Sequence, residues 1–217
     1  MEELPIVAAR KFERLADDPE PDLPRIAWKV QVRLQEQATP RLVTLEEIDG
    51  HLGTAEHRIR SCRRGFRVLG NDNKFIVESR SHILEEALDR GITVRVMCVA
   101  PRSIGSETLQ IIDPRFPKAG DFEKSMGPVE EILRRLRDAY GGLLDFRYLR
   151  IAPAMGLFIT DPDDPNHGVV KVEIYGIQPF KPLGSRPHLL LGPAMEDWRR
   201  YFIQQWDNYW AVAERVP

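Results

Sequence analysis

Histidine and carboxylate side chains are the groups in this sequence that could carry out acid–base or nucleophilic chemistry. His167 lies in the polar stretch 161–168, close in sequence to Asp161 and Glu173. A histidine oriented by one of these carboxylates could serve as the general base of a hydrolase or phosphodiesterase. The same stretch is rich in aspartate, proline, asparagine and glycine, which is also typical of a polar hairpin turn. Both interpretations stay open at the level of the sequence.

The other histidines and the two cysteines lack the spacing that a metal site or a known catalytic motif requires. No His-Glu-x-x-His pair is present, and the aspartates at 161–164 lack the glycine and the terminal glutamate of a calcium loop. No nucleophile elbow, P-loop or dinucleotide fingerprint occurs. Cys62 lies among arginines that could lower the pKa of its thiol, whereas Cys98 lies in an apolar run. We therefore expect no metal ion and no cofactor.

Two predicted strands end in polar loops that could form a binding site. The apolar run 66–70 stops at residues 71–74, and the run 93–99 stops at residues 100–103. A helix over 73–90 joins the two strands and predicts a right-handed parallel crossover. Ligands of open α/β sheets bind beyond the carboxyl ends of the strands, so we expect both loops at one rim of the sheet.

The following segments extend this unit to a mixed α/β sheet. Helical spacing of apolar residues over 128–140 and alternation over 144–151 predict a second helix and a third parallel strand. Residues 155–160 and 169–175 predict an antiparallel hairpin. We expect a parallel β-α-β-α-β core plus this hairpin, flanked by an N-terminal helical arm and a C-terminal aromatic helix over about 194–215.

Proline and glycine positions divide the chain into two predicted parts. Residues 1–54 are expected to form a helical N-terminal extension, whose last helix begins with Thr44 and Glu47 as a capping box. Residues 55–217 are expected to form the α/β domain, including the C-terminal helix. Within it, residues 101–126 are predicted as a long connection, with Pro128 in the first turn of the next helix.

The order of these elements resembles one half of a phospholipase D-like domain. The matching segments are Phe66–Asn71, Arg90–Met97, and Phe158–Asp161 together with Gly168. In that family a hairpin carries the motif His-x-Lys-x-x-x-x-Asp, followed by Gly-Ser-x-Asn. The histidine attacks a phosphodiester, and the lysine and the asparagine hold its phosphate oxygens. The resemblance covers roughly residues 55–175.

The chain departs from the family at the reactive positions. With Asp161 and Gly168 matched to the motif, the positions of its histidine, lysine, serine and asparagine are occupied by Ala154, Gly156, Val169 and Lys171. An alanine offers neither a nucleophile nor a proton to transfer. The resemblance therefore implies a degenerate phospholipase D-like domain that lacks this chemistry.

The polar strand ends and the resemblance together predict a non-catalytic ligand-binding, regulatory or interaction domain. Its expected ligand is a phosphate-bearing small molecule or a nucleotide. The residues predicted to line the site are Asn71, Asp72, Asn73, Lys74, Arg102, Ser103, Asp161, Lys171 and Glu173. Two alternatives remain, namely a hydrolase that uses His167 and a subunit of a defence or signalling assembly. In the second alternative a protein partner or another copy of the chain would cover the aromatic helix or the N-terminal arm.

The charge and composition of the chain set the remaining expectations. The formal net charge is −2, so no overall field attracts nucleic acid or an anionic membrane, and we do not expect either as a partner. Five arginines between Arg58 and Arg67 could complement a helix dipole or bind phosphate, and both interpretations stay open. The low cysteine content and the lack of a signal peptide or long apolar run predict a cytoplasmic protein.

Overall fold

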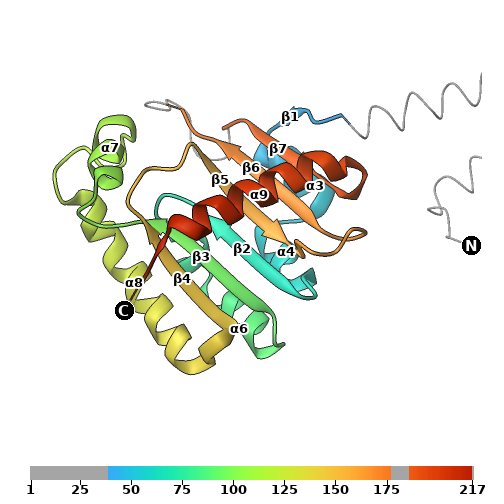
Figure 1. Ribbon diagram of the computed structural model, residues 1–217, viewed down its shortest axis with the longest axis horizontal. Coiled ribbons are helices and arrows are strands. Elements are labelled where there is room, and N and C mark those ends of the chain that lie inside the picture. Colours follow the sequence, from blue (N-terminus) through green and yellow to red (C-terminus); the bar gives the residue numbers. More distant parts are fainter. Residues whose placement is uncertain (1–38, 177–185, 217) are drawn as a thin grey trace, which may run out of the picture. The chain divides into compact units, whose positions relative to one another are not determined.

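The predicted parallel strands form the centre of a mixed sheet in the computed structural model, which describes residues 39–176 and 186–216 (Figure 1). Over these residues the sheet has eight strands in the order β1-β7-β6-β5-β2-β3-β4-β8. The strands are β1 (Leu42–Val43), β2 (Gly65–Leu69), β3 (Thr93–Val99), β4 (Leu144–Leu149), β5 (Met155–Thr160), β6 (Val169–Ile174), β7 (His188–Leu191) and β8 (Glu214–Arg215).

The register of the central strands confirms the predicted sheet class. β2 and β4 both run parallel to β3, with Phe66 beside Val94 and Val96 beside Phe146. β5 lies on the other side of β2 and runs antiparallel to it, so that Val68 is paired with Phe158. The hairpin β5–β6 then continues antiparallel to β7. The fold is therefore a mixed α/β sheet with a parallel β-α-β-α-β core and an antiparallel half.

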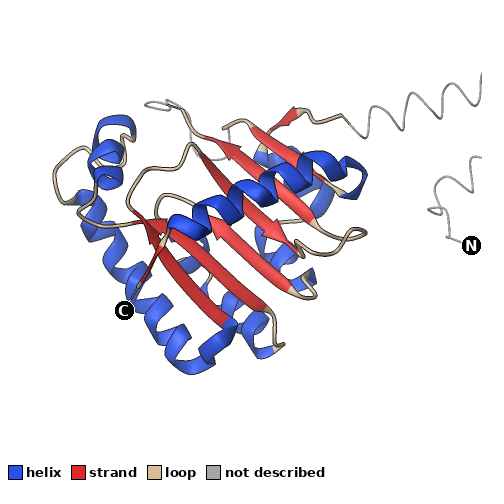
Figure 2. Ribbon diagram, in the orientation of Figure 1, coloured by secondary structure: helices blue, strands red, loops and turns tan. Residues whose placement is uncertain are grey.

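Helices cover both faces of the sheet (Figure 2). The helices of the described residues are α3 (Leu45–Leu52), α4 (Ala55–Ser61), α5 (Lys74–Val77), α6 (Ser81–Asp89), α7 (Ile104–Ile112), α8 (Asp121–Tyr140) and α9 (Glu196–Val212), with the short 3-10 turns η1 (Gly141–Leu143) and η3 (Pro193–Met195). On one face, a buried cluster packs the helices from α4 to α8 on the sheet, where Phe66 and Phe158 belong to the same cluster. A second cluster on the opposite face packs α9 on the sheet through Trp206.

The region 101–126 differs from the prediction of a long connection. It contains α7 and the start of α8, and Pro128 lies inside α8 rather than in its first turn. Phe122 and Met126, two buried residues at helical spacing, continue the apolar face of α8 toward its N-terminus. Their burial outweighs the hydrogen bond that a proline removes from a helix interior.

The helix predicted over 73–90 is divided in two. Asn73 precedes α5 with a left-handed φ of 48°, and its side chain makes no capping hydrogen bond to that helix. Its amide Nδ2 instead donates to the carbonyl of Met97 on β3, at 2.7 Å. The side chain that was expected to cap a helix therefore ties the end of β2 to its parallel neighbour.

The two ends of the described chain also refine the predictions. The capping box of Thr44 and Glu47 is present at the start of α3, and this helix belongs to the same compact unit as the sheet, a unit that begins at Pro40. The predicted N-terminal arm lies mostly outside the described residues. On α9, Trp206 is fully buried, but Trp198 is 49% exposed, so the aromatic stripe is not uniformly part of the core.

None of the helices within residues 39–176 and 186–216 combines the length and the apolar composition that crossing a lipid bilayer requires.

Candidate functional site

A cavity of about 380 Å³ opens at the carboxyl end of β2, and we call it the rim cavity. Its walls come from α3, α4 and α5 and from the strands β2, β5, β6 and β7. The charged and polar side chains that line it are Asp49, Thr54, Arg58, Asn71, Asp72, Asn73, Lys74, Ser79, Arg80, Arg115, Lys171, Glu173, Tyr175, Arg186 and His188. A volume in this range suits a small polar ligand.

The loop 71–74 forms one wall of the rim cavity, as predicted from the strand end. The carboxylate of Asp72 lies 3.2 Å from the guanidinium of Arg115 and also accepts a hydrogen bond from the backbone N–H of Lys74. The ammonium of Lys74 lies 3.2 Å from Glu78. Asn71 is buried, and its side-chain oxygen has no hydrogen-bond partner among the described residues. This oxygen is an unused acceptor in the cavity wall.

Strand β6 supplies the opposite wall through alternate residues. Lys171 and Glu173 are paired in register with Phe158 and Gly156 of β5. Paired residues point to the same side of a sheet, and Phe158 belongs to the buried cluster opposite α9. The ammonium of Lys171 lies 5.7 Å from the ring centroid of Phe158. Two of the predicted hairpin residues therefore lie in the same cavity as the loop 71–74.

Burial changes the protonation of several groups at this wall. Burial lowers the pKa of Lys171, and nearby Glu173 opposes the shift. Burial also lowers the pKa of His188, and the charge of Lys171 lowers it further. The pKa of Tyr175 is raised, mainly by burial, so its hydroxyl stays protonated. Burial thus disfavours the charged form of each of these groups, which is typical of a site with limited access to water.

Two arginines of the cavity were not predicted as site residues. Arg58, on α4, is 5% exposed, and its Nη1 donates to the carboxylate of Asp49 at 3.0 Å. Arg186 is 7% exposed and donates to Glu173 at 2.8 Å. The sequence did mark Arg58 as part of an arginine cluster, but nothing in its spacing distinguished this side chain from its solvated neighbours. Arg186 comes from a region without a recognisable element.

The rim cavity holds several buried polar atoms that have no hydrogen-bond partner among the described residues. Leaving aside Arg80 Nε, which lies 2.9 Å from Glu56, they are Arg58 Nε and Nη2, Arg186 Nε, Asn71 Oδ1 and His188 Nδ1. All four side chains are at least nine-tenths buried. Buried polar groups are satisfied in the large majority of cases, so their concentration along one cavity marks it as a candidate site.

Two predicted site residues have structural roles away from this cavity. Ser103 caps α7, where its hydroxyl accepts a hydrogen bond from the backbone N–H of Ser106. Arg102 is exposed at a left-handed φ of 57°, and its backbone N–H donates to Glu123. The strand ends of β2 and β3 are adjacent, as expected, because the N–H of Val99 donates to the carbonyl of Asn71. Ser103, however, caps the N-terminus of α7, the helix that follows β3, and does not line the rim cavity.

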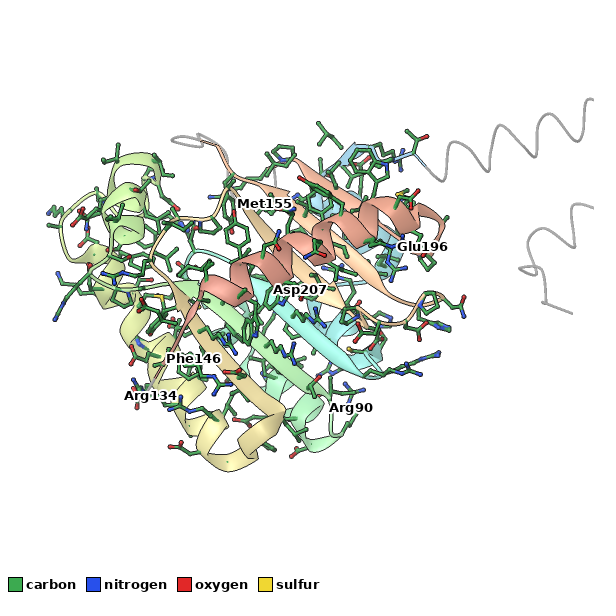
Figure 3. All side chains as sticks on the ribbon, in the orientation of Figure 1. Arg90, Arg134, Phe146, Met155, Glu196 and Asp207 are labelled. Carbon is green, nitrogen blue, oxygen red and sulfur yellow. The ribbon has the colours of Figure 1, made fainter. Side chains whose placement is uncertain are left out.

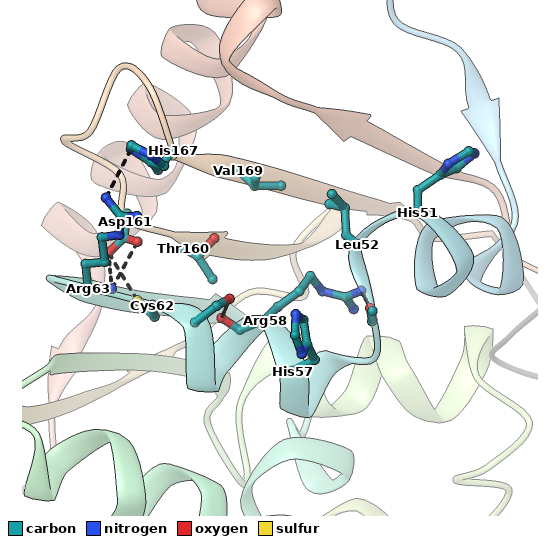
Figure 4. Close-up of a pocket in the computed structure, with 12 residues that line it drawn as sticks. His51, Leu52, His57, Arg58, Cys62, Arg63, Thr160, Asp161, His167 and Val169 are labelled. Atoms are coloured by element: carbon teal, nitrogen blue, oxygen red, sulfur yellow. Dashed lines mark hydrogen bonds between the residues drawn. The ribbon is translucent and has the colours of Figure 1, made fainter. Parts of the chain in front are cut away.

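Asp161 lines a different cavity of about 450 Å³ at the other end of β2, which we call the loop cavity (Figure 4). Its carboxylate accepts hydrogen bonds from the backbone N–H groups of Arg63, Arg64 and Gly65, the shortest being 2.7 Å from Arg64. A carboxylate saturated in this way fixes the turn before β2. Asp161 therefore does not join the other predicted residues at the rim cavity.

His167 also lies at the loop cavity, where its imidazole Nδ1 is 3.5 Å from the guanidinium of Arg63 (Figure 4). The same Nδ1 is 3.4 Å from the carboxylate of Asp164. Its predicted partners are engaged elsewhere, since Asp161 bonds to backbone and Glu173 lines the rim cavity. Cys62 lies in the same region, and burial followed by the hydrogen bond to Asp161 raises the pKa of its thiol to about 11. The neighbouring arginines therefore do not activate this cysteine.

Comparisons with known proteins give similarity only at the level of structure. No protein-family model and no curated protein matches the chain. The chain is similar to TrmBL2, an archaeal chromatin protein that shows a novel mode of DNA binding, with 13% identity over 97% of this chain and 70% of that chain and a TM-score of 0.49. It is also similar to NUC from Salmonella typhimurium, a phospholipase D family member, with 12% identity over 82% of this chain and 97% of that chain and a TM-score of 0.43.

These similarities bear on two predictions. A phospholipase D family member is among the similar structures, and this similarity concerns the fold alone. The prediction that nucleic acid is an unlikely partner is contradicted, since one of the similar structures is that of TrmBL2, a chromatin protein that binds DNA. That prediction was based on the net charge of the whole chain, which does not report how charge is distributed over one surface.

Proposed function

We propose that this chain is a ligand-binding domain with a regulatory or interaction role, and that its ligand occupies the rim cavity and carries a phosphate or another anionic group. The observation that supports this most directly is the set of buried, unsatisfied polar atoms of Arg58, Asn71, Arg186 and His188 along one cavity. A ligand with matching donors and acceptors would remove the free-energy cost of leaving these atoms unbonded.

The lack of phospholipase D chemistry is part of the same proposal. In the predicted alignment Gly156 stands at the position of the motif lysine. A Cβ atom built on Gly156 would lie 2.6 Å from the hydroxyl oxygen of Tyr175, so a longer side chain requires Tyr175 to move. This close approach favours a glycine at the position. It supports a binding pocket rather than a degraded site that a single substitution could restore.

A thermal-shift screen with nucleotides and sugar phosphates tests the proposed binding. A ligand at about 100 times its dissociation constant should stabilise the wild-type protein by about 2.7 kcal/mol. The variant Asn71→Ala removes an acceptor from the cavity wall and should reduce the shift. The matched control Asn208→Ala removes an asparagine on α9 that bonds to Gln204, away from the cavity lining, and should keep it. Equal shifts for both variants would place the ligand elsewhere.

Two further arms of the screen address the other functions. A DNA duplex belongs in the panel, because nucleic acid is no longer excluded.

Hydrolysis of a phosphodiester such as bis(p-nitrophenyl) phosphate should not rise above the level of the buffer. If hydrolysis appears and is lost in His167→Ala, the loop cavity is an active site and the proposal of a non-catalytic domain is wrong.

A further inference from the structure

The charges around the rim cavity are paired with one exception. Arg58 is paired with Asp49, Arg186 with Glu173, and Arg115 with both Asp72 and Asp113. Two further cations at the rim are also paired: Lys74 with Glu78, and Arg80 with Glu56. Among the cations that line the cavity and belong to the described residues, Lys171 alone has no carboxylate within ion-pair distance.

The surroundings of Lys171 leave its ammonium free to meet a ligand. Its Nζ lies 5.7 Å from the ring centroid of Phe158, and among the described residues no hydrogen bond or ion pair involves this atom. An ammonium has three donors, and a partly buried one without an anion carries a desolvation cost. Arg58, which lines the same cavity, adds two nitrogen atoms without a hydrogen-bond partner, Nε and Nη2, and Asn71 adds one unbonded acceptor.

We propose that the rim cavity binds a small oxyanion of single negative charge, a carboxylate or a phosphodiester, with Lys171 as its counter-ion and Asn71 as the acceptor for a hydroxyl or amine of the same ligand. This inference rests on the proposed ligand-binding function and narrows its ligand class. One unpaired cation matches one negative charge. A phosphate monoester would bring nearly two negative charges to a cavity that has one unpaired positive charge. A neutral ligand would leave the ammonium covered and unpaired.

The carboxylate and the phosphodiester are distinguished by two matched series of probes. The first series is glucose, glucuronate and glucose 6-phosphate, and the second is adenosine, cyclic 3′,5′-AMP and 5′-AMP. Each series keeps one molecular body and changes the charge from zero to one to two. Dissociation constants from isothermal titration calorimetry, measured for wild-type protein in the same buffer, give the order within each series.

The expected result is that the monoanion of at least one series binds about tenfold or more tightly than both its neutral and its doubly charged relative. Lys171→Met should lower the affinity for that monoanion by about tenfold to a hundredfold and abolish the preference over the neutral relative. Lys171→Arg keeps the charge and should keep the preference. Tightest binding of a neutral or doubly charged probe, or unchanged binding by Lys171→Met, would overturn the inference.

The ligand-free protein offers a second readout. Because Lys171 is partly buried and has no ion-pair partner among the described residues, Lys171→Met should raise the melting temperature of the ligand-free protein, whereas a structural lysine would give a lower melting temperature on removal. A lower melting temperature would therefore overturn the role of Lys171. If none of the six probes binds, the proposed ligand-binding function falls as well, whereas binding in the wrong order of charge refutes the monoanion alone.

Discussion

The carboxylate of Asp161 accepts a hydrogen bond of 2.7 Å from the backbone N–H of Arg64. The two residues meet at one end of the antiparallel β2–β5 pairing, since Asp161 follows β5 and Arg64 precedes β2. The same carboxylate also accepts from the N–H groups of Arg63 and Gly65. The aspartate matched to the phospholipase D motif thus fixes where one strand ends and its neighbour begins. These hydrogen bonds are enough to explain why an aspartate occupies position 161, without a catalytic role.

Replacing Asp161 by asparagine should destabilise the fold by about 2 kcal/mol, because charge-assisted hydrogen bonds to backbone N–H groups are lost. Asparagine tolerates the left-handed φ of 47° at this position, so the change reports on the carboxylate and not on backbone strain. Urea unfolding measures the difference. The control Asp163→Asn changes a neighbouring carboxylate that is 79% exposed, where an effect below about 1 kcal/mol is expected. Equal losses in both variants would contradict the role of Asp161.

Gly168 should not tolerate a side chain. A Cβ at this position would lie 2.5 Å from the carbonyl oxygen of Asp161 and 2.6 Å from that of Asp164, so backbone would have to move. Gly168→Ala is expected to cost about 1–3 kcal/mol of the free energy of unfolding. Gly127, inside α8, has open space around its Cβ position. Gly127→Ala should therefore be neutral or stabilise by up to about 1 kcal/mol, and the opposite order of the two variants would refute the packing argument.

His188 should make the fold less stable in acid. Burial, and then the charge of Lys171, lowers its pKa in the folded state below the ordinary value of 6.5. The unfolded chain therefore takes up the proton first as the pH falls through 6.5, and the free energy of unfolding decreases below that pH. Glu173 opposes the shift, and Arg186 acts both through its charge, which lowers the pKa, and through a backbone hydrogen bond, which raises it.

Urea unfolding of wild type and His188→Gln at several pH values between 8 and 5 measures this contribution. The difference in stability between the two proteins should be constant above pH 7 and should change in favour of the glutamine variant below about pH 6.5. Lys171→Met removes one of the two main causes of the shift, so it should weaken the acid dependence. A constant difference over the whole range would show that His188 does not contribute to it.

The two cysteines should resist thiol reagents in the native state. Burial is the main cause that raises the pKa of Cys62 to about 11 and that of Cys98 to about 12. At pH 8 the reactive thiolate is then scarce and both sulfurs are covered. Labelling with a disulfide reagent should be at least about a hundredfold slower than for a free thiol, and it should reach two groups per chain after denaturation. Fast labelling of Cys62 in the folded protein would contradict this.

The sheet class and the loop 71–74 could be predicted from the sequence because both depend on local patterns. The run ending at Leu69 and the run ending at Val99 are apolar, parallel and followed by polar residues, and they lie side by side. The helical part of 101–126 was missed because glycine, serine and proline suggested a loop. The burial of Phe122 and Met126 against the sheet decides the structure there.

The candidate site was only partly predictable, because the sequence does not show which side chains from distant parts of the chain line the rim cavity. Lys171 and Glu173 were expected beside Asn71 on the basis of strand order, and they do line its cavity. Arg58 lies on α4 and Arg186 lies just before β7, and the position of each relative to β2 depends on tertiary packing. Asp161 was assigned to the wrong end of the sheet, because the antiparallel direction of β5 carries its last residue away from the carboxyl end of β2.

Within the described residues, the order in which the strands are synthesised is not the order in which they are paired (Figures 1 and 3). A nascent chain that ends after β4 already contains β2, β3 and β4, but the partner on the other side of β2, β5, has yet to be made. Until Met155–Thr160 leaves the ribosome, β2 presents an apolar strand with unpaired backbone groups along one edge. Such edges promote association between chains. Translation that stalls between β4 and β5 is therefore expected to leave the β2 edge open to association with other chains.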